Sequence, residues 1–329
     1  MLPHTSNNHT SKDILLTGLN EFLGKSVLEE LLIKFPTSRI FCLLDSKTQK
    51  LSCEKLIDNC AYKNVKLLDG NTSKEHLGLC KEDYMFCVES INCIVHCEDA
   101  SFKSKINSIQ SNIHILDLIR NIEQLGNKKP AFLFVSAALP NILENKEIEN
   151  DASFNFRNTY EEDKFTIEKL IKSYEDHCHY FIVRPSTILA KHSGEYDLGD
   201  ENIQALINVN KENHSLINVL SRDALYDFVT VEYVSKNIVD ILSNAKTIPS
   251  STIFNITDHK GGLTHTHAVE ILNTMFKISL KDESRNKEKN TQYSCENIQK
   301  YVYENDILTL NSSEILRRVC QYYLDKQKN

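Results

Sequence analysis

A tyrosine and a lysine stand four residues apart in this chain, at Tyr160 and Lys164. If the segment is helical, both side chains lie on one face, because positions i and i+4 are neighbours on a helix. The lysine ammonium group would then stabilise the phenolate form of the tyrosine. Such a tyrosine can give a proton to a developing alkoxide while a nicotinamide cofactor delivers a hydride. The spacing alone is common in a chain with many lysines and tyrosines, so the interpretation depends on the surrounding elements.

A glycine turn near the start of the chain is the second chemical feature. The apolar run 14–17 is followed directly by Gly18, and Gly24 precedes a helical pattern from Val27 to Phe35. In a dinucleotide turn the first glycine makes the bend, the second lets the backbone approach the pyrophosphate, and the third packs the helix on the strand. Here the middle position is Glu21, whose volume and charge oppose phosphate binding at a helix N-terminus.

Apolar runs alternate with helical patterns through most of the chain. The strand-like runs are 14–17, 39–44, 64–68, 92–97, 131–136 and 180–184, and helical patterning covers 106–125 and 161–174. This order predicts right-handed crossovers and an α/β fold, a Rossmann-type doubly wound parallel sheet. Beyond it we expect a strand at 226–231, a helix at 234–242 and a strand at 251–256.

The same pattern predicts the domain organisation. We expect a disordered lead at 1–12 and a dinucleotide-binding domain at 13–190, to which 226–256 returns. Residues 191–225 and 257–329 would form a smaller C-terminal substrate lobe at the carboxyl edge of the sheet, where ligands bind in this fold class. The strongly charged segment 281–300 is predicted to be mobile surface.

Composition limits the partners and the compartment. The net charge of −7 and a pI near 6.0 argue against nucleic acid as a ligand. The sequence has no run of 18 apolar residues and no basic start followed by an apolar segment, so neither a membrane span nor a secretory signal is predicted. Ten cysteines in such a chain are interpreted as reduced thiols, which favours a cytoplasmic location.

Several cysteines and histidines could bind a metal ion, but their positions are better explained by ordinary strand and surface structure. Cys93, His96 and Cys97 fall on one strand, whose alternating side chains point to different faces. The segment 176–179, and His265 with His267, are interpreted as solvated surface. We therefore predict no metal site.

The chain resembles the extended short-chain dehydrogenases/reductases, and within them the thioester reductase and fatty acyl-CoA reductase branch, also called male sterility proteins. The Gly18-x-x-x-Phe22-Leu23-Gly24 turn carries this resemblance together with three further segments. These are Leu77-Gly78-Leu79, Asn158-Thr159-Tyr160 through Lys164, and Val183-Arg184-Pro185-Ser186. Their order and spacing extend the resemblance from about Asp13 to Asn255.

The resemblance implies hydride transfer from NAD(P)H to an acyl thioester, an acyl-CoA or an acyl-carrier-protein conjugate, giving an aldehyde or an alcohol. By position, Tyr160 is the general acid, Lys164 holds the nicotinamide ribose, and Ser136 lies at the strand end that hydrogen-bonds the substrate carbonyl. The implied cofactor-binding positions are Gly18, Asn20, Glu21, Phe22, Leu23, Gly24, Asp45, Asp69, Gly70, Lys164 and Pro185.

Several departures from the branch fall on these positions. Glu21 replaces the second glycine, Ala137 stands where the branch has a threonine, and Glu98 and Asp99 replace small residues after the fourth strand. Asp45 stands where the branch usually has an arginine for the 2′-phosphate. A carboxylate there would bond a ribose diol and repel a phosphate, which favours NADH over NADPH.

Three functions are therefore compatible with the sequence. The first is an active reductase with altered cofactor contacts, and the second is a pseudoenzyme of the same fold that acts as a binding or scaffold protein. The third, a sugar-nucleotide epimerase or dehydratase, is less favoured, because the Leu77-Gly78-Leu79 string points to the acyl-thioester branch.

Overall fold

The structure is a computed structural model, and it describes eight stretches of the chain: 11–44, 63–97, 108–138, 159–196, 226–258, 262–278, 295–302 and 310–328. Asp45, Glu98 and Asp99 lie outside these residues, as do residues 1–10 of the predicted lead and 197–225 of the predicted lobe.

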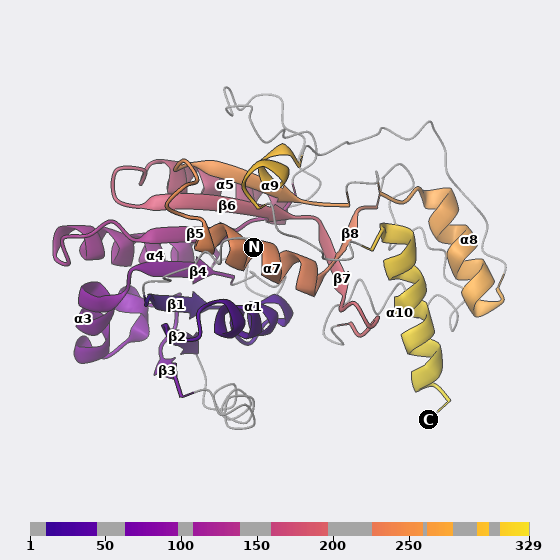
Figure 1. Ribbon diagram of the computed structural model, residues 1–329, viewed down its shortest axis with the longest axis horizontal. Helices are drawn as coiled ribbons and strands as arrows, with labels where there is room; N and C mark the ends of the chain where they lie inside the picture. Colours follow the sequence, from indigo (N-terminus) through magenta and orange to yellow (C-terminus); the bar gives the residue numbers. More distant parts are fainter. Residues whose placement is uncertain are drawn as a thin grey trace, which may run out of the picture. The chain divides into compact units, whose positions relative to one another are not determined.

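A seven-stranded sheet forms the centre of the fold, in the order β3-β2-β1-β4-β5-β6-β9. Figure 1 shows β1 to β5 side by side, and their pairings are parallel. The strands are β1 (Asp13–Thr17), β2 (Arg39–Leu44), β3 (Val65–Asp69), β4 (Cys93–His96), β5 (Ala131–Val135), β6 (His179–Pro185) and β9 (Thr252–Ile256). The apolar runs of β1, β2, β4, β5 and β6 are buried, whereas β3, at the edge of the sheet, is buried only at Leu68. The predicted Rossmann-type doubly wound sheet is confirmed.

Helices connect these strands, as the alternating pattern predicted. They are α1 (Phe22–Lys34), the short 3-10 helix η1 (Glu75–Gly78), α3 (Lys81–Ser90), α4 (Ser108–Gln124), α5 (Thr159–Lys172), α7 (Val231–Ser243), α8 (His265–Phe276), α9 (Glu296–Tyr301) and α10 (Ser312–Lys326). The strand expected at 226–231 is β8 (Phe228–Thr230), which pairs with β7 (Thr187–Ala190) in a separate two-stranded sheet.

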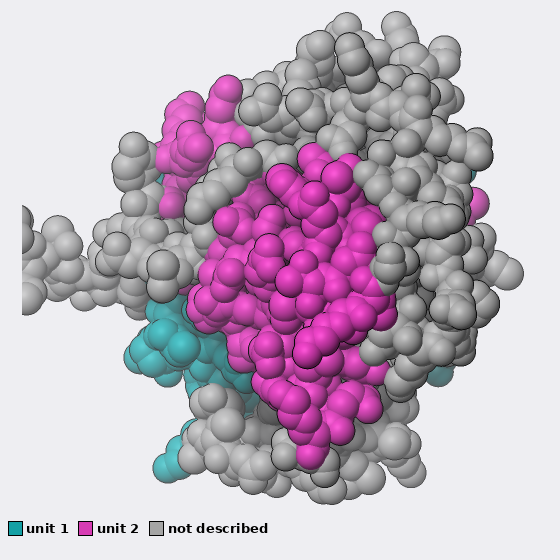
Figure 2. Space-filling model, turned by 90° about the vertical axis from the view of Figure 1, so that its right-hand side faces the viewer, with its two compact units in different colours: residues 1–135, 162–181, 245–251 teal, residues 136–161, 182–244, 252–329 magenta. Residues whose placement is uncertain are grey.

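The chain divides into two compact units, coloured separately in Figure 2. Unit 1 comprises residues 1–135, 162–181 and 245–251, and unit 2 comprises 136–161, 182–244 and 252–329. Within unit 2, apolar side chains of β7, β8, α8 and α10 form a core of their own, which includes Leu189, Phe228, Leu272 and Val319. The domain boundaries given above stay a prediction.

Three expectations about surface segments were wrong. Residues 296–300, the end of the segment expected to be mobile, belong to helix α9, while 281–294 lie outside the described residues. His265 is buried and its Nδ1 lies 3.2 Å from the hydroxyl of Tyr226, whereas His267 is exposed as expected. Cys178, in the segment expected to be solvated, is buried as well.

Candidate active site

The glycine turn has the backbone geometry of a tight bend followed by close packing. Gly18 follows β1 with φ +79°, a left-handed conformation that glycine adopts without steric cost. Gly24 lies in the first turn of α1, where an added Cβ would overlap the carbonyl oxygen of Gly18. Both positions therefore require glycine for reasons of conformation and space, and the backbone is shaped as in a dinucleotide turn.

Glu21 occupies the N-cap position of α1 in an ordinary extended conformation, with φ −81° and ψ 159°. The backbone at this position has no need of glycine. The Glu21 side chain makes no capping hydrogen bond to α1, and its Oε1 accepts one from Nδ2 of Asn20 at 3.0 Å. Intrahelical bonding begins with the amide of Lys25, which donates to the Glu21 carbonyl at 3.3 Å. The amides of Phe22, Leu23 and Gly24 are therefore the first-turn donors that a helix offers to an anion.

The carboxyl ends of β1 and β4 carry a buried polar pair directly before this turn. Thr17 and His96 are partners in the parallel register of the two strands, and Thr17 Oγ1 lies 2.5 Å from His96 Nδ1. Both residues are about 1 % exposed. Burial, together with the charge of Lys164, lowers the pKa of His96 to about 3, so the imidazole is neutral at physiological pH.

Lys164 is fixed at the carboxyl end of β5. Its side chain is 4 % exposed, and Nζ donates a hydrogen bond to the carbonyl of Val135, the last residue of that strand, at 3.1 Å. Nζ also lies 5.3 Å from the ring centroid of Phe134, within the range of a cation–π contact. Helix α5 carries Tyr160, which is half-buried, in its first turn and Lys164 in the next, so the helical spacing predicted for the pair is present.

Ser136 and Pro185 lie together in unit 2. Ser136 is 3 % exposed, and its amide donates to the carbonyl of Val183 at 2.7 Å. The amide of Ala138 donates to the carbonyl of Pro185, the last residue of β6, at 2.8 Å. The chain after β5 thus follows the end of β6, which holds Ser136 beside the Val183-Arg184-Pro185 segment.

The predicted adenine positions lie at the end of β3. Asp69 is exposed, and Gly70 donates its amide to the carbonyl of Leu44 at 3.0 Å. A Cβ on Gly70 would lie 2.6 Å from the carbonyl oxygen of Leu77, so this position has room only for glycine. The Leu77-Gly78-Leu79 string therefore packs against the end of β3, and Asn71 donates its amide to the same Leu77 carbonyl at 2.6 Å.

Comparison with known proteins identifies the family. Residues 16–238 match the NAD-binding domain described for the male sterility protein family, which covers more than half of the chain. This chain belongs to that family. The predicted resemblance to the extended short-chain dehydrogenases/reductases is confirmed.

Among curated proteins, fatty acyl-CoA reductase 1 of Xenopus laevis is similar to this member of the male sterility family. The two are 28 % identical over 151 residues, which cover 40 % of this chain and 29 % of the relative. The match therefore spans less than a third of the length of that reductase.

Solved structures resemble this family member over almost its whole length. The terminal R domain from the myxalamid PKS-NRPS biosynthetic pathway has a TM-score of 0.75 and 18 % identity, over 98 % of this chain and 93 % of that one. The reductase (R) domain of a non-ribosomal peptide synthetase from Mycobacterium tuberculosis has a TM-score of 0.73 and 17 % identity, over 96 % and 92 %. At these identities the likeness shows a shared fold.

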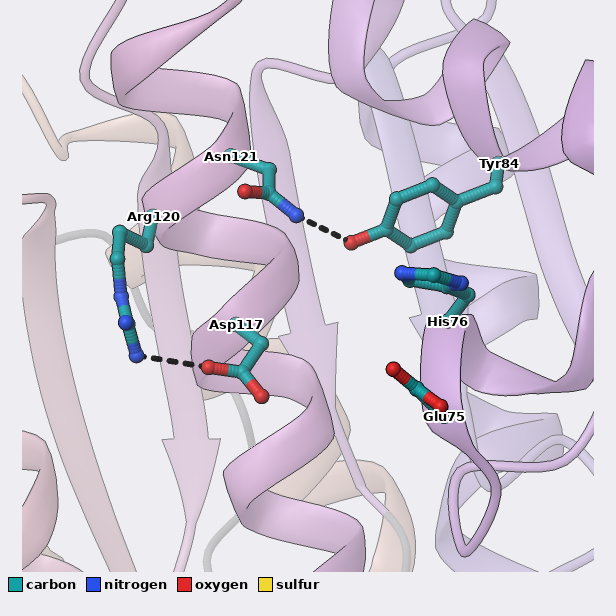
Figure 3. Close-up of a pocket in the computed structure, with 6 residues that line it drawn as sticks. All are labelled: Glu75, His76, Tyr84, Asp117, Arg120 and Asn121. Atoms are coloured by element: carbon teal, nitrogen blue, oxygen red, sulfur yellow. Dashed lines mark hydrogen bonds and ion pairs between the residues drawn. The ribbon is translucent and has the colours of Figure 1, made fainter.

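A polar pocket outside the predicted positions lies between η1, α3 and α4 (Figure 3). His76 stacks on Tyr84 with ring centroids 4.6 Å apart, and the Tyr84 hydroxyl accepts a hydrogen bond from Asn121 at 2.7 Å. On the opposite wall Arg120 forms an ion pair with Asp117 at 2.7 Å. Tyr84 ends the string that begins at Leu77 in the family resemblance, but the pocket itself has no local sequence signal, because its three elements are brought together only by the fold.

Neither a metal-binding cluster nor a membrane-spanning helix is found among the described residues. Within the part of the chain that the structure describes, no group of three or more His, Cys, Asp or Glu side chains is arranged to hold a metal ion. No described helix is both long and apolar enough to cross a membrane.

Proposed function

We propose that this protein is an NAD(P)-dependent reductase of an acyl thioester, carried by CoA or by an acyl carrier protein, with an aldehyde or alcohol as product. The observation that carries the proposal is the fixed position of Lys164. Its Nζ is buried, bonded to the carbonyl at the end of β5, and follows Tyr160 by one helical turn. Family membership and the partial similarity to a fatty acyl-CoA reductase support the same activity.

The chain's own groups supply binding and proton transfer. The bound nicotinamide would supply a hydride to the thioester carbonyl carbon. Tyr160 would give its phenolic proton to the oxygen on which negative charge develops, while Lys164 stabilises the phenolate that remains. Ser136 would donate a hydrogen bond to the same oxygen. Loss of the thiol from the reduced carbon then yields the aldehyde, and a second hydride and proton would give the alcohol.

The first turn of α1 fits a pyrophosphate in its backbone but carries an extra charge. The amides of Phe22, Leu23 and Gly24 would donate to the phosphate oxygens, and Asp69 and Gly70 would lie near the adenine. The Glu21 carboxylate stands at the same helix end and opposes an anion there. Asp45, directly after β2, would favour NADH over NADPH.

Glu21 also favours a second candidate, a binding or scaffold protein that has kept the fold without turnover. A carboxylate about 4 Å from a phosphate costs on the order of 4 kcal/mol at an effective dielectric constant of about 20. Hydrogen bonding of Glu21 to the exposed Asn20 amide, and not to the helix amides, reduces this cost. We therefore favour the active reductase.

Nicotinamide fluorescence separates the two candidates without knowledge of the substrate. The purified protein would be titrated with NADH and with NADPH, and then assayed for cofactor oxidation with long-chain and aryl acyl-CoA thioesters. Saturable binding followed by thioester-dependent oxidation is the expected result. The absence of binding to either cofactor would overturn the proposal and leave the scaffold function.

A further inference from the structure

His96 is a buried imidazole that the proposed chemistry does not use. Its Nδ1 forms a hydrogen bond with Oγ1 of Thr17, the residue immediately before Gly18. The backbone reinforces this link, because the amide of Cys97 donates to the Thr17 carbonyl at 3.3 Å. The end of β1, from which the pyrophosphate turn departs, is therefore held by both the main chain and the side chain of β4.

The same imidazole lies close to Lys164. Its ring stacks on Phe134, with centroids 6.0 Å apart and an interplanar angle of 24°, and the Lys164 ammonium group lies over the same Phe134 ring. The side chain of Asn112 on α4 lies beside the imidazole and acts on its pKa as well. Among the described residues, the groups that face His96 are thus Thr17 on β1, Asn112 on α4, Phe134 on β5 and Lys164 on α5, and Lys164 is the cation of this set.

We propose that His96 is a positioning residue that couples the pyrophosphate turn to Lys164, through its hydrogen bond to Thr17 on one side and the shared Phe134 ring on the other. This inference rests on the proposed function for its effect on the cofactor. The contacts themselves are a property of the protein alone.

The electrostatics of the cluster explain why a histidine serves here. A neutral imidazole offers one donor and one acceptor, so it can bond Thr17 and lie beside Asn112 without adding charge. A second cation beside the buried ammonium group would repel it in a region of low dielectric. Burial and the charge of Lys164 both hold the pKa of His96 far below its ordinary value, which keeps the ring neutral.

The link between His96 and the pyrophosphate turn can be tested by measuring dinucleotide dissociation constants in a double-mutant cycle of Thr17 and His96. Thr17→Val and His96→Phe each remove the hydrogen bond while preserving size and burial, and each should weaken dinucleotide binding about 3- to 10-fold, the range of one neutral hydrogen bond. The double variant should bind no worse than either single one. His96→Asn places an amide where Nδ1 stands and should restore most of the affinity, and His267→Asn, at an exposed position, is the matched control.

The same variants also distinguish a role of His96 in positioning the turn from a role in the stability of the fold alone. Lower melting temperatures with unchanged dissociation constants for the folded protein would assign His96 a structural role only and overturn the proposal. A rise in KM larger than any fall in kcat for His96→Phe is the expected kinetic split, because the turn binds the cofactor and does not touch the reacting carbon.

Ring-labelled histidine NMR tests the link to Lys164 in the protein without cofactor. The signal that disappears in His96→Asn should stay in the neutral form from pH 8 to pH 5, and it should titrate at higher pH in Lys164→Met than in the parent. The coupling would be refuted if the signal titrates near pH 6.5 in the parent, or if its titration midpoint is the same in Lys164→Met as in the parent. If the NMR result is as expected and the parent binds no dinucleotide, the proposed function fails while the coupling stands.

Discussion

Tyr160 carries the proton in the proposed reaction, and removal of its hydroxyl is the most direct test of that role. We expect Tyr160→Phe to lower kcat by a factor of about 100 to 10,000, the usual range for a positioned general acid. The dissociation constant for NADH should change little, because the phenol contacts the substrate oxygen. Steady-state kinetics and a fluorescence titration of the same variant give both numbers. Normal turnover would remove Tyr160 from the mechanism.

Lys164 should behave differently, since two roles are assigned to it. Lys164→Ala is expected to weaken cofactor binding and to lower kcat, because the ribose contact and the stabilisation of the phenolate are lost together. Lys169, on the same helix with its ammonium 4.5 Å from the ring centroid of Phe165, gives the matched control Lys169→Ala. Equal effects of the two substitutions would contradict the specific role of Lys164.

The cost of Glu21 can be divided into charge and volume. Because φ at this position is ordinary, Glu21→Gln removes the charge with little change in backbone or size, and Glu21→Gly removes both. We expect Glu21→Gly to tighten NADH binding by ~1 to 3 kcal/mol, with most of the gain already present in Glu21→Gln. Unchanged affinity in both variants would show that the carboxylate points away from the phosphates.

Asp45 is expected to set the cofactor preference, although it lies outside the described residues. Asp45→Arg should shift the preference toward NADPH, because a guanidinium group pairs with a 2′-phosphate through two hydrogen bonds. The measurement is the ratio of the dissociation constants for NADH and NADPH in parent and variant. Tighter binding of NADPH than of NADH in the parent would contradict the role given to Asp45.

Among the elements, helix α1 depends on Gly24 for its contact with the turn. A methyl group at this position would overlap the Gly18 carbonyl, so the helix must shift away from β1. We expect Gly24→Ala to lower the free energy of unfolding by ~1 to 3 kcal/mol, the usual cost of overpacking, and to weaken dinucleotide binding as well. Urea unfolding measures the first effect, and Lys25→Ala, at an exposed position of the same helix, is the control.

The elements of the sheet were predictable because each strand is a short apolar run, while the helices between them repeat apolar residues at helical spacing. The order of these runs was enough to predict a parallel sheet. Local signals also located Gly18 and Gly24, since the conformation and the close packing at these positions admit only glycine.

Other features could not be read from local pattern. His76 and Leu77 adopt left-handed backbone conformations, with φ 53° and 57°, which their residue types do not indicate. His265 begins a helix in a polar sequence, yet it is buried against Tyr226 through contacts made 39 residues apart. The carbonyl that holds Lys164 belongs to a strand 29 residues earlier, so the tertiary fold alone supplies that contact.

At the scale of the whole molecule, a buried acid in unit 2 should link stability to pH. Desolvation raises the pKa of Asp227 to about 6, and the nearby Ser186 side chain and the hydrogen bond from the amide of Asp258 oppose this rise. The carboxylate of Asp258 adds to the rise. Because the folded state holds this proton more tightly than the unfolded state, the contribution of Asp227 to stability is greatest below about pH 4 and is lost as the pH rises through 6.

Asp227→Asn removes this titration and keeps an oxygen that can accept from the Asp258 amide at 2.8 Å. We expect the variant to be more stable than the parent at pH 8 by on the order of 2 kcal/mol, and similar to it at pH 4. Denaturant unfolding at both pH values measures the difference. A variant less stable than the parent at pH 8 would show that the ionised carboxylate makes favourable contacts that outweigh its desolvation.

The core of unit 2 can fold only late during translation, because it joins segments that are far apart in the sequence. Arg318 on α10 bonds the carbonyl of His192 at 2.9 Å across 126 residues of sequence, and Ser312 bonds the amide of Phe228 across 84. The apolar side chains of β7 therefore become buried only after α10 has been translated and has left the exit tunnel. At ~5 to 20 residues per second this interval lasts on the order of 10 s, during which the nascent chain exposes a surface that chaperones recognise.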